Sequence, residues 1–267
     1  MSTLAVLGNI SRDSAIYPDG RIFQLLGGAA LHVALAASQA GMNAAPVSVI
    51  GTDLAWIRDD PRLTGVDLTQ VKLAKGASCT FDLVYDDAGT LIRADSAFGV
   101  ARLLTRHCLA AIGRHARYHV CCRRPLNVRA VLDRLTRNRL PFSADFHLAS
   151  AGNLIRVAAP FLPRATAVFV NSAEFTILDA LTDLSRLAAV IVSDGPRKAM
   201  LLRRGQITAT AVPPATAATE VTGAGDALAG AFLAGIIGGA DDRSALESAV
   251  TAASRSVQQA RLIVTMR

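Results

Sequence analysis

Lysine is scarce in this sequence, and arginine carries almost all of the positive charge. The net charge is +7, yet lysine occurs only as Lys72, Lys75 and Lys198. A compositional bias toward arginine explains this excess better than a surface patch that binds nucleic acid. Nucleic-acid binding is therefore a minor hypothesis, while an anionic substrate is compatible with the charge.

Long apolar segments are missing as well. The stretches 31–40 and 227–239 are too short to span a bilayer and are interrupted by glycine or polar residues. The first residues run straight into a strand-like segment, without the basic start and long apolar core of a signal peptide. We therefore expect a cytoplasmic protein with no membrane partner.

Cysteine patterns that hold metals are also missing. The four cysteines are Cys79, Cys108, Cys121 and Cys122. They form no Cys-x-x-Cys pair and have no histidine at a spacing typical of a metal cage. We expect them to be reduced, mostly buried thiols.

What is present is the composition of a globular α/β protein. Of the 267 residues, 51% are hydrophobic and 18% charged, which suffices for one large domain with a small appendage or for two modest domains. Strand-like runs alternate with helical ones, as in a parallel sheet covered by helices. The expected strands are 4–8, 45–50, 118–121, 141–144, 167–170 and 189–193. The expected helices are 29–40, 103–115, 127–137, 172–180, 226–238 and 242–259.

Two segments break this alternation. Residues 21–24 and 79–94 have strand character, and the second contains the turn Asp86-Asp-Ala-Gly89 of a predicted β-hairpin. They could form a lid over an active site, or a surface hairpin without a role in function. Because two-stranded ribbons are marginal alone, a lid would lean on substrate or on a second subunit.

The most informative motif is the run Thr222-Gly-Ala-Gly-Asp226, followed by an apolar helix. Gly223, Ala224 and Gly225 leave their amides accessible, so a phosphate could approach the unpaired N–H groups that open the helix. Asp226 would then lie close enough to accept a proton from an attacking hydroxyl. Alternatively, Asp226 is only a first-turn carboxylate favoured by the helix dipole.

A second glycine turn, Gly27-Gly28, directly precedes another predicted helix in the N-terminal third. Its backbone could approach a small polar ligand closely. Asp13 follows the first strand, where open α/β sheets bind ligands, and could accept hydrogen bonds from sugar hydroxyls. From its spacing alone, Asp13 could equally serve only to form a turn.

Two further strand ends carry polar residues. Asn171 and Glu174 could form a capping box, or could organise a hydrated Mg²⁺ near nucleotide phosphates. Ser193-Asp-Gly195 ends the next strand in a small-residue turn that could pass beneath a nucleotide.

In this order, the motifs resemble those of the ribokinase-like, or pfkB-type, carbohydrate kinases over essentially the whole chain. Gly27-Gly28 resembles the first family signature, Asn171-Ser-Ala-Glu174 the Asn-x-x-Glu motif, and Thr222-Gly-Ala-Gly-Asp226 the second signature. The resemblance implies one domain over residues 1–267, built as a three-layer α/β/α sandwich with a mostly parallel sheet. It also implies a small β lid formed from about 11–26 and 76–97.

The resemblance implies roles for individual residues. Asp226 is similar to the catalytic base of the family, and the backbone of Gly223, Ala224 and Gly225 to its anion hole. The residues implied to contact the phosphate acceptor are Ser11, Asp13, Gly27, Gly28 and His32. Those implied to bind nucleotide are Asn171, Glu174, Ser193, Gly195 and Thr222. Glu174 and Asp145 are similar to residues that hold Mg²⁺ through water.

Several positions depart from the family pattern. His32 and Ser11 stand where asparagine is usual, which leaves the choice of substrate open. Glu220 and Val221 replace a common Asp and Thr in a stretch that helps bind a monovalent cation in relatives, so potassium dependence is also open. After Gly195, the nucleotide loop lacks its usual second glycine.

These observations predict an ATP- and Mg²⁺-dependent kinase that phosphorylates a hydroxymethyl group of a sugar, sugar acid or nucleoside. The alternative is a non-catalytic sugar- or nucleotide-binding protein on a kinase fold, suggested by His32 and by the altered loop after Gly195. The edges of the predicted lid strands make a homodimer through the lid an expectation.

Overall fold

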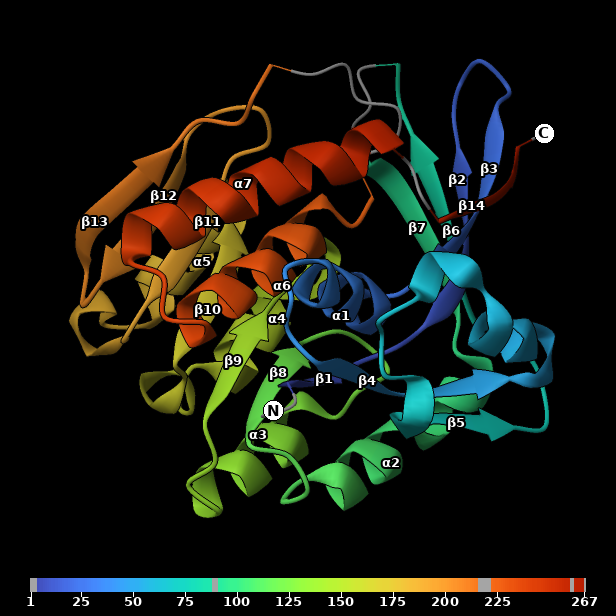
Figure 1. The fold of residues 1–267 in the computed structure, drawn as a ribbon, viewed down its shortest axis with the longest axis horizontal. Helices are drawn as coiled ribbons and strands as arrows, with labels where there is room; N and C mark the ends of the chain where they lie inside the picture. Colours follow the sequence, from blue (N-terminus) through green and yellow to red (C-terminus); the bar gives the residue numbers. More distant parts are fainter. Residues whose placement is uncertain (1–3, 88–90, 216–221, 260–261, 267) are drawn as a thin grey trace.

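A nine-stranded sheet forms the centre of the computed structural model, which describes residues 4–87, 91–215, 222–259 and 262–266 (Figure 1). Neighbouring strands are parallel except at one end, where β12 and β13 are antiparallel. In spatial order the strands are β13 (Gln206–Ala211), β12 (Ala199–Arg203), β11 (Val190–Ser193), β10 (Ala167–Asn171), β9 (Phe142–Asp145), β8 (Arg117–Cys121), β1 (Leu4–Leu7), β4 (Ala44–Gly51) and β5 (Val71–Ala74). All six predicted strands lie in this sheet, with each bound within one residue of its prediction.

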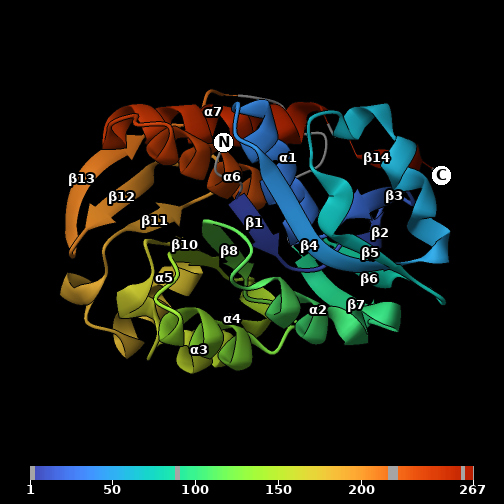
Figure 2. The same cartoon turned by 60° about the horizontal axis from the view of Figure 1, so that its bottom comes forward.

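Helices cover both faces of the sheet, which confirms the three-layer arrangement (Figure 2). One face carries α1 (Ala29–Gln39), α6 (Ala224–Ile237) and α7 (Asp242–Gln259). The other carries α2 (Leu104–Ala111), α3 (Val128–Arg137), α4 (Leu148–Ala158) and α5 (Ser172–Leu181). Short 3₁₀ helices span Thr52–Asp59, Pro61–Leu63, Leu68–Gln70, Gly99–Leu103, Leu162–Arg164 and Leu184–Arg186.

Glycine allows two of these helices to pack closely. A Cβ on Gly230 of α6 would lie 2.2 Å from the carbonyl oxygen of Val33 in α1. Because the backbones meet there, α6 is held against α1 and against the apolar core beneath both helices. The first turn of α6, which contains Asp226, is thereby fixed relative to the strand ends.

The predicted helix 103–115 is too long at its C-terminal end, because α2 ends at Ala111. The Tyr118 hydroxyl accepts hydrogen bonds from the backbone amides of Gly113, at 2.7 Å, and His115, at 3.0 Å. Those amides are therefore satisfied by a side chain instead of by helical carbonyls. Gly113 also has a φ of 97°, which does not continue a helix.

A second, five-stranded sheet fits the predicted lid. Its order is β14 (Ile263–Met266), β3 (Ile22–Gly27), β2 (Ser11–Ile16), β6 (Cys79–Tyr85) and β7 (Leu91–Ala97). The β6–β7 hairpin was predicted, although part of its turn, 88–90, lies outside the described residues. The participation of β14 was not predicted; it pairs with β3 and covers one edge of the small sheet.

The link between β5 and β6 is tightly held where the two sheets meet. The Asp53 carboxylate accepts hydrogen bonds from the amide of Ser78, at 2.9 Å, and from its hydroxyl, at 2.7 Å. A Cβ on Gly51 would lie 2.2 Å from the Gly76 carbonyl, and one on Gly99 would lie 2.2 Å from the Ala77 carbonyl. The root of the β6–β7 hairpin is therefore fixed by close backbone packing.

Among the described residues, no helix combines the length and apolar character needed to cross a bilayer.

Candidate active site

A cavity of about 760 Å³ lies at the carboxyl ends of the parallel strands, where open α/β sheets bind ligands. It receives residues from the ends of β9, β10 and β11, from the first turn of α6, and from the small sheet. The predicted site residues that line it are Ser11, Asp13, Gly28, His32, Asp145, Asn171, Glu174, Ser193, Thr222, Gly223, Ala224, Gly225 and Asp226. The fold therefore gathers nearly every predicted position into one cavity.

Gly27 and Gly195 are the two predicted residues that do not line this cavity. Gly27 instead lies against Asp13, whose Oδ2 would be 1.9 Å from a Cβ at that position. Its role in the structure is to leave room for the Asp13 carboxylate. Gly195 has a φ of 57°, which favours glycine in the turn after β11, and a Cβ there would meet nothing within 4 Å.

The first turn of α6 is open toward the cavity. Its N-cap residue, Gly223, has a φ of 83° and supplies no side-chain cap. A Cβ on Gly223 would lie 2.7 Å from His32 Nδ1, whereas one on Gly225 would meet nothing within 4 Å. Because the first amides of a helix have no intrahelical acceptor, this turn can bind an anion through backbone N–H groups.

The first turn of α5 has a different arrangement. The Asn171 side chain accepts a hydrogen bond from the Glu174 amide, and the Glu174 carboxylate accepts one from the Asn171 amide, both at 2.9 Å. The predicted capping box is thus present. Burial raises the pKa of Glu174 to about 7, with Asp145 and Asp226 adding to the shift.

Arg123, which the sequence analysis did not single out, joins two of the predicted carboxylates. Its Nη2 donates to Asp145 Oδ2 at 2.7 Å and to Asp226 Oδ1 at 2.5 Å. Burial raises the pKa of Asp226, while the Arg123 charge acts in the opposite direction. The same guanidinium holds the pKa of Asp145 well below its usual range against the effect of burial.

The acceptor side of the cavity contains buried polar atoms that lack partners. Ser11 Oγ and Asp13 Oδ1 meet no group of good hydrogen-bond geometry among the described residues. Burial raises the pKa of Asp13 to about 7. Buried polar atoms without partners are costly, so this end of the cavity suits a ligand with several hydrogen-bonding groups.

Aromatic side chains line the same cavity. Phe81 and Tyr85 come from β6, and Phe98 follows β7. Tyr85 also joins the small sheet to the turn before α6, through a 2.9 Å hydrogen bond between its hydroxyl and that of Thr222. The sequence analysis predicted the hairpin but not these contacts.

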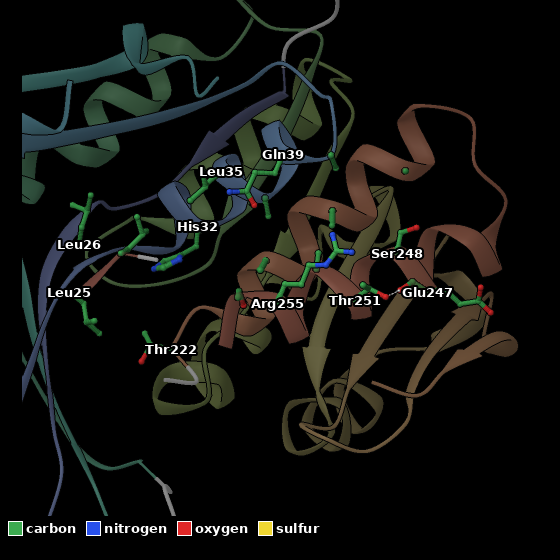
Figure 3. Close-up of a pocket in the computed structure, with 18 residues that line it drawn as sticks. Leu25, Leu26, His32, Leu35, Gln39, Thr222, Glu247, Ser248, Thr251 and Arg255 are labelled. Atoms are coloured by element: carbon green, nitrogen blue, oxygen red, sulfur yellow. Dashed lines mark hydrogen bonds between the residues drawn. The ribbon is translucent and has the colours of Figure 1, made fainter. Parts of the chain in front are cut away.

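A second hollow, of about 690 Å³, lies between α1, α6 and α7 (Figure 3). Its walls include small residues of α6 and polar residues of α7, among them Thr251 and Arg255. His32 and Thr222 line both this hollow and the larger cavity. His32, which the sequence predicts to contact the phosphate acceptor, therefore lies between the two cavities.

Comparison with known proteins agrees with this architecture. The model of the pfkB family carbohydrate kinases matches residues 1–266. A cytidine kinase of Thermococcus kodakarensis is 28% identical over 254 residues, covering 88% of each chain. A nucleoside kinase of Burkholderia thailandensis, solved with inosine, superposes with a TM-score of 0.80 at 21% identity, covering 96% of this chain and 91% of the other.

A more distant structure extends the comparison. A nucleoside kinase of Methanocaldococcus jannaschii has a TM-score of 0.76 at 17% identity, covering 97% of this chain and 92% of its own. Together with the match along the chain, these likenesses confirm the predicted ribokinase-like fold. The chain belongs to the pfkB family of carbohydrate kinases and is a carbohydrate or nucleoside kinase.

Proposed function

We propose that this kinase transfers the γ-phosphate of ATP to the hydroxymethyl group of a nucleoside. The observation that carries the proposal is a single cavity lined by Asp13, by the open turn at Asp226 and by aromatic side chains that include Phe81, Tyr85 and Phe98. Aromatic rings offer a flat apolar surface that suits a nucleobase better than a bare sugar. The relatives named as cytidine and nucleoside kinases support the same substrate class.

Asp13 and Ser11 suit the ribose. Their buried, unpartnered oxygens would receive hydrogen bonds from ribose hydroxyls, which can donate as well as accept. Binding would thereby relieve the cost of burying the Asp13 carboxylate. Gly28, whose φ is 98°, would let the backbone approach the sugar closely.

Asp226 is the proposed general base. In the transfer step, the acceptor hydroxyl oxygen would bond to the γ-phosphorus, its proton would pass to Asp226, and the bond from phosphorus to the β-phosphate oxygen would break to release ADP. The amides that open α6 would stabilise charge on the transferred group. Because Arg123 contacts Asp226 in the structure, this ion pair must loosen as Asp226 gains the proton.

The nucleotide would occupy the side of the cavity formed by Asn171, Ser193 and Thr222. The donor set near the phosphates fits Mg²⁺, which prefers oxygen ligands, since the carboxylates of Asp145 and Glu174 line the same cavity. When bound, Mg²⁺ supplies charge neutralisation for the phosphates. Residues 220 and 221, on which the monovalent-cation prediction depends, lie outside the described residues.

The proposal is tested by measuring ADP release from ATP and Mg²⁺ across a panel of nucleosides, sugars and sugar acids. We expect turnover with nucleosides, and loss of that turnover in Asp226→Asn by about 10²–10⁴-fold, the usual contribution of a general base. Turnover that is restricted to sugars or sugar acids would overturn the nucleoside assignment. Ligand-induced thermal stabilisation without ADP formation would instead favour a binding protein on a kinase fold.

A further inference from the structure

The buried ring of His119 lies directly behind Asp145. His119 of β8 pairs with Ser143 of β9, and Asp145 is two residues further along β9, so its side chain lies on the same face of the sheet. His119 Nε2 is 3.6 Å from Asp145 Oδ1, and the His119 side chain is fully buried. The imidazole therefore faces the carboxylate on the side opposite to its bond with Arg123.

Two contacts hold this ring in place. His119 Nδ1 forms a 2.8 Å hydrogen bond with Ser143 Oγ. The ring also packs edge to face against Phe169, at 5.7 Å between centroids, and Phe169 packs in the same way against Phe232 of α6. His119 is thus fixed both by a hydrogen bond and by aromatic packing.

The facing atoms of His119 and Asp145 have no other partners. Neither Nε2 nor Oδ1 forms another hydrogen bond among the described residues. Because an ionised carboxylate only accepts hydrogen bonds, the nitrogen that faces it carries the proton, and Nδ1 then accepts from the Ser143 hydroxyl. Because the His119 ring is held by Ser143 and Phe169, a small rotation of the Asp145 carboxylate is what would close the 3.6 Å separation into a hydrogen bond.

The other oxygen of Asp145 connects this pair to the proposed reaction. One atom, Arg123 Nη2, contacts both Asp145 Oδ2 and Asp226 Oδ1. When Asp226 accepts the proton of the acceptor hydroxyl, it loses its negative charge and its attraction for Arg123 falls. Asp145 is then the carboxylate that keeps Arg123 in its place in the wall of the cavity.

We propose that His119 is a positioning residue for phosphoryl transfer, which orients Asp145 so that Asp145 holds Arg123 in place while Asp226 accepts the proton. This inference rests on the proposed function, because it assigns the base to Asp226. His119 touches neither substrate nor nucleotide in this mechanism and acts through Asp145 and Arg123.

The same side chains present a second arrangement to be tested. Donor atoms of His119, Cys121 and Asp145 all lie within 4.8 Å of one another, a spacing that could hold a metal ion. Burial raises the pKa of the Cys121 thiol well above its ordinary value, so the thiol is protonated. Because metals bind the thiolate, the protonated thiol favours the hydrogen-bonded arrangement over a metal site that includes Cys121.

Two substitutions of similar size separate positioning from simple packing. His119→Gln places an amide N–H near the position of Nε2, whereas His119→Asn places its amide near Nδ1 and leaves Asp145 Oδ1 without a facing donor. We expect His119→Asn to lower kcat by about 10–100-fold with both KM values changed less than about 3-fold, and His119→Gln to stay within about 3-fold of wild-type kcat. The Tm of each variant is measured alongside.

The outcomes decide the question in either direction. Equal losses of kcat in the two variants, in step with equal losses of Tm, would assign His119 a packing role and overturn the proposal. Cys121→Ala is the matched control and should keep wild-type kcat. If it loses as much kcat as His119→Asn, and the wild type carries one metal ion per chain that both variants lack, a metal site replaces the positioning role.

Wild type and Asp226→Asn are assayed first, so that the two proposals fail in different ways. A wild type without acceptor-dependent turnover, or an active Asp226→Asn, removes the proposed function and the inference with it. An active wild type, an inactive Asp226→Asn and a fully active His119→Asn remove the positioning role alone.

Discussion

Two helices begin at the same cavity, and their first turns differ in how they satisfy their amides. The turn of α5 is closed by its own side chains, because Asn171 and Glu174 form a reciprocal capping box. The turn of α6 is left open, because Gly223 supplies no side-chain cap. The difference shows how one fold can use a helix N-terminus either for stability or for binding an anion.

The largest expected effect comes from filling the open turn. Gly225→Ala adds a methyl group that meets no atom within 4 Å beyond its chain neighbours and its own helix backbone, and alanine favours a helix more than glycine does, so we expect no loss of Tm. If the phosphates approach these amides as we propose, the methyl group would obstruct them, and kcat/KM for ATP should fall by about 10²–10³-fold, as when an anion-hole donor is lost. Steady-state kinetics and thermal unfolding of the same preparation test both parts. Near-wild-type kinetics would show that the turn does not bind phosphate.

Gly223→Ala provides the matched comparison within the same turn. Its new Cβ would lie 2.7 Å from His32 Nδ1 at a φ of 83°, so this variant should lose Tm as well as activity. A loss of activity alone in Gly225→Ala, compared with a loss of both activity and Tm in Gly223→Ala, would distinguish the anion-binding surface of the turn from the backbone conformation that Gly223 allows.

The closed turn can be tested through its pH dependence. Burial raises the pKa of Glu174 from its ordinary value of 4.5 to about 7 in the folded protein. The folded state therefore binds the proton more tightly, and this contribution to stability is complete below about pH 4.5 and lost as the pH rises through about 7. Glu174→Gln keeps a side-chain oxygen that can accept the hydrogen bond from the Asn171 amide, and it removes the negative charge. We expect it to raise the free energy of unfolding by roughly 2 kcal/mol at pH 8 and hardly at all at pH 4.

Denaturant titrations of both proteins across that pH range measure this difference. If the difference in the free energy of unfolding between variant and wild type is the same at pH 4 and pH 8, the buried-charge explanation is contradicted. The activity of Glu174→Gln at saturating Mg²⁺ shows separately whether the carboxylate also serves the nucleotide.

A smaller effect is expected from opening the closed turn. Asn171→Ala removes the side-chain acceptor for the Glu174 amide, and loss of such a cap costs about 1 kcal/mol. Urea unfolding measures that loss. If Asn171 serves only as a cap, KM for ATP should stay unchanged, whereas a rise in KM would support its proposed nucleotide contact.

The smallest effect concerns the bond between the small sheet and the open turn. Tyr85→Phe removes the hydroxyl that lies 2.9 Å from Thr222 Oγ1 and keeps the ring. We expect a stability loss of about 0.5–1 kcal/mol, typical of one hydrogen bond, and a modest rise in KM for the acceptor. Unchanged kinetics in this variant would show that this hydrogen bond does not couple the small sheet to the first turn of α6.

The central sheet could be predicted well because its signal is local. Its six predicted strands are short apolar runs whose burial on both faces follows from helices covering the sheet. β13 was missed because it is mostly exposed and polar at the end of the sheet, and β14 because its pairing with β3 joins distant parts of the chain. The helix α4 was also missed, since Gly152 and small residues weaken its pattern.

The candidate site was predictable where residues lie inside a motif, as at Asp226 and Asn171. Arg123 lies in an arginine-rich stretch, and only the folded chain shows that it reaches Asp145 and Asp226. Its position two residues after the end of the strand β8 is the one sequence signal that could have indicated it. His119 was hidden for another reason, because its partner Ser143 belongs to a neighbouring strand.

The close packing at the root of the β6–β7 hairpin has a spectroscopic consequence. Trp56, the single tryptophan of the sequence, donates its indole N–H to the carbonyl oxygen of Asp53 at 3.1 Å. Asp53 in turn binds Ser78, the residue just before β6. Trp56 is 40% exposed, so its emission is sensitive to solvent. We therefore expect its fluorescence to give an intrinsic, label-free signal when the contact between Asp53 and Ser78 changes.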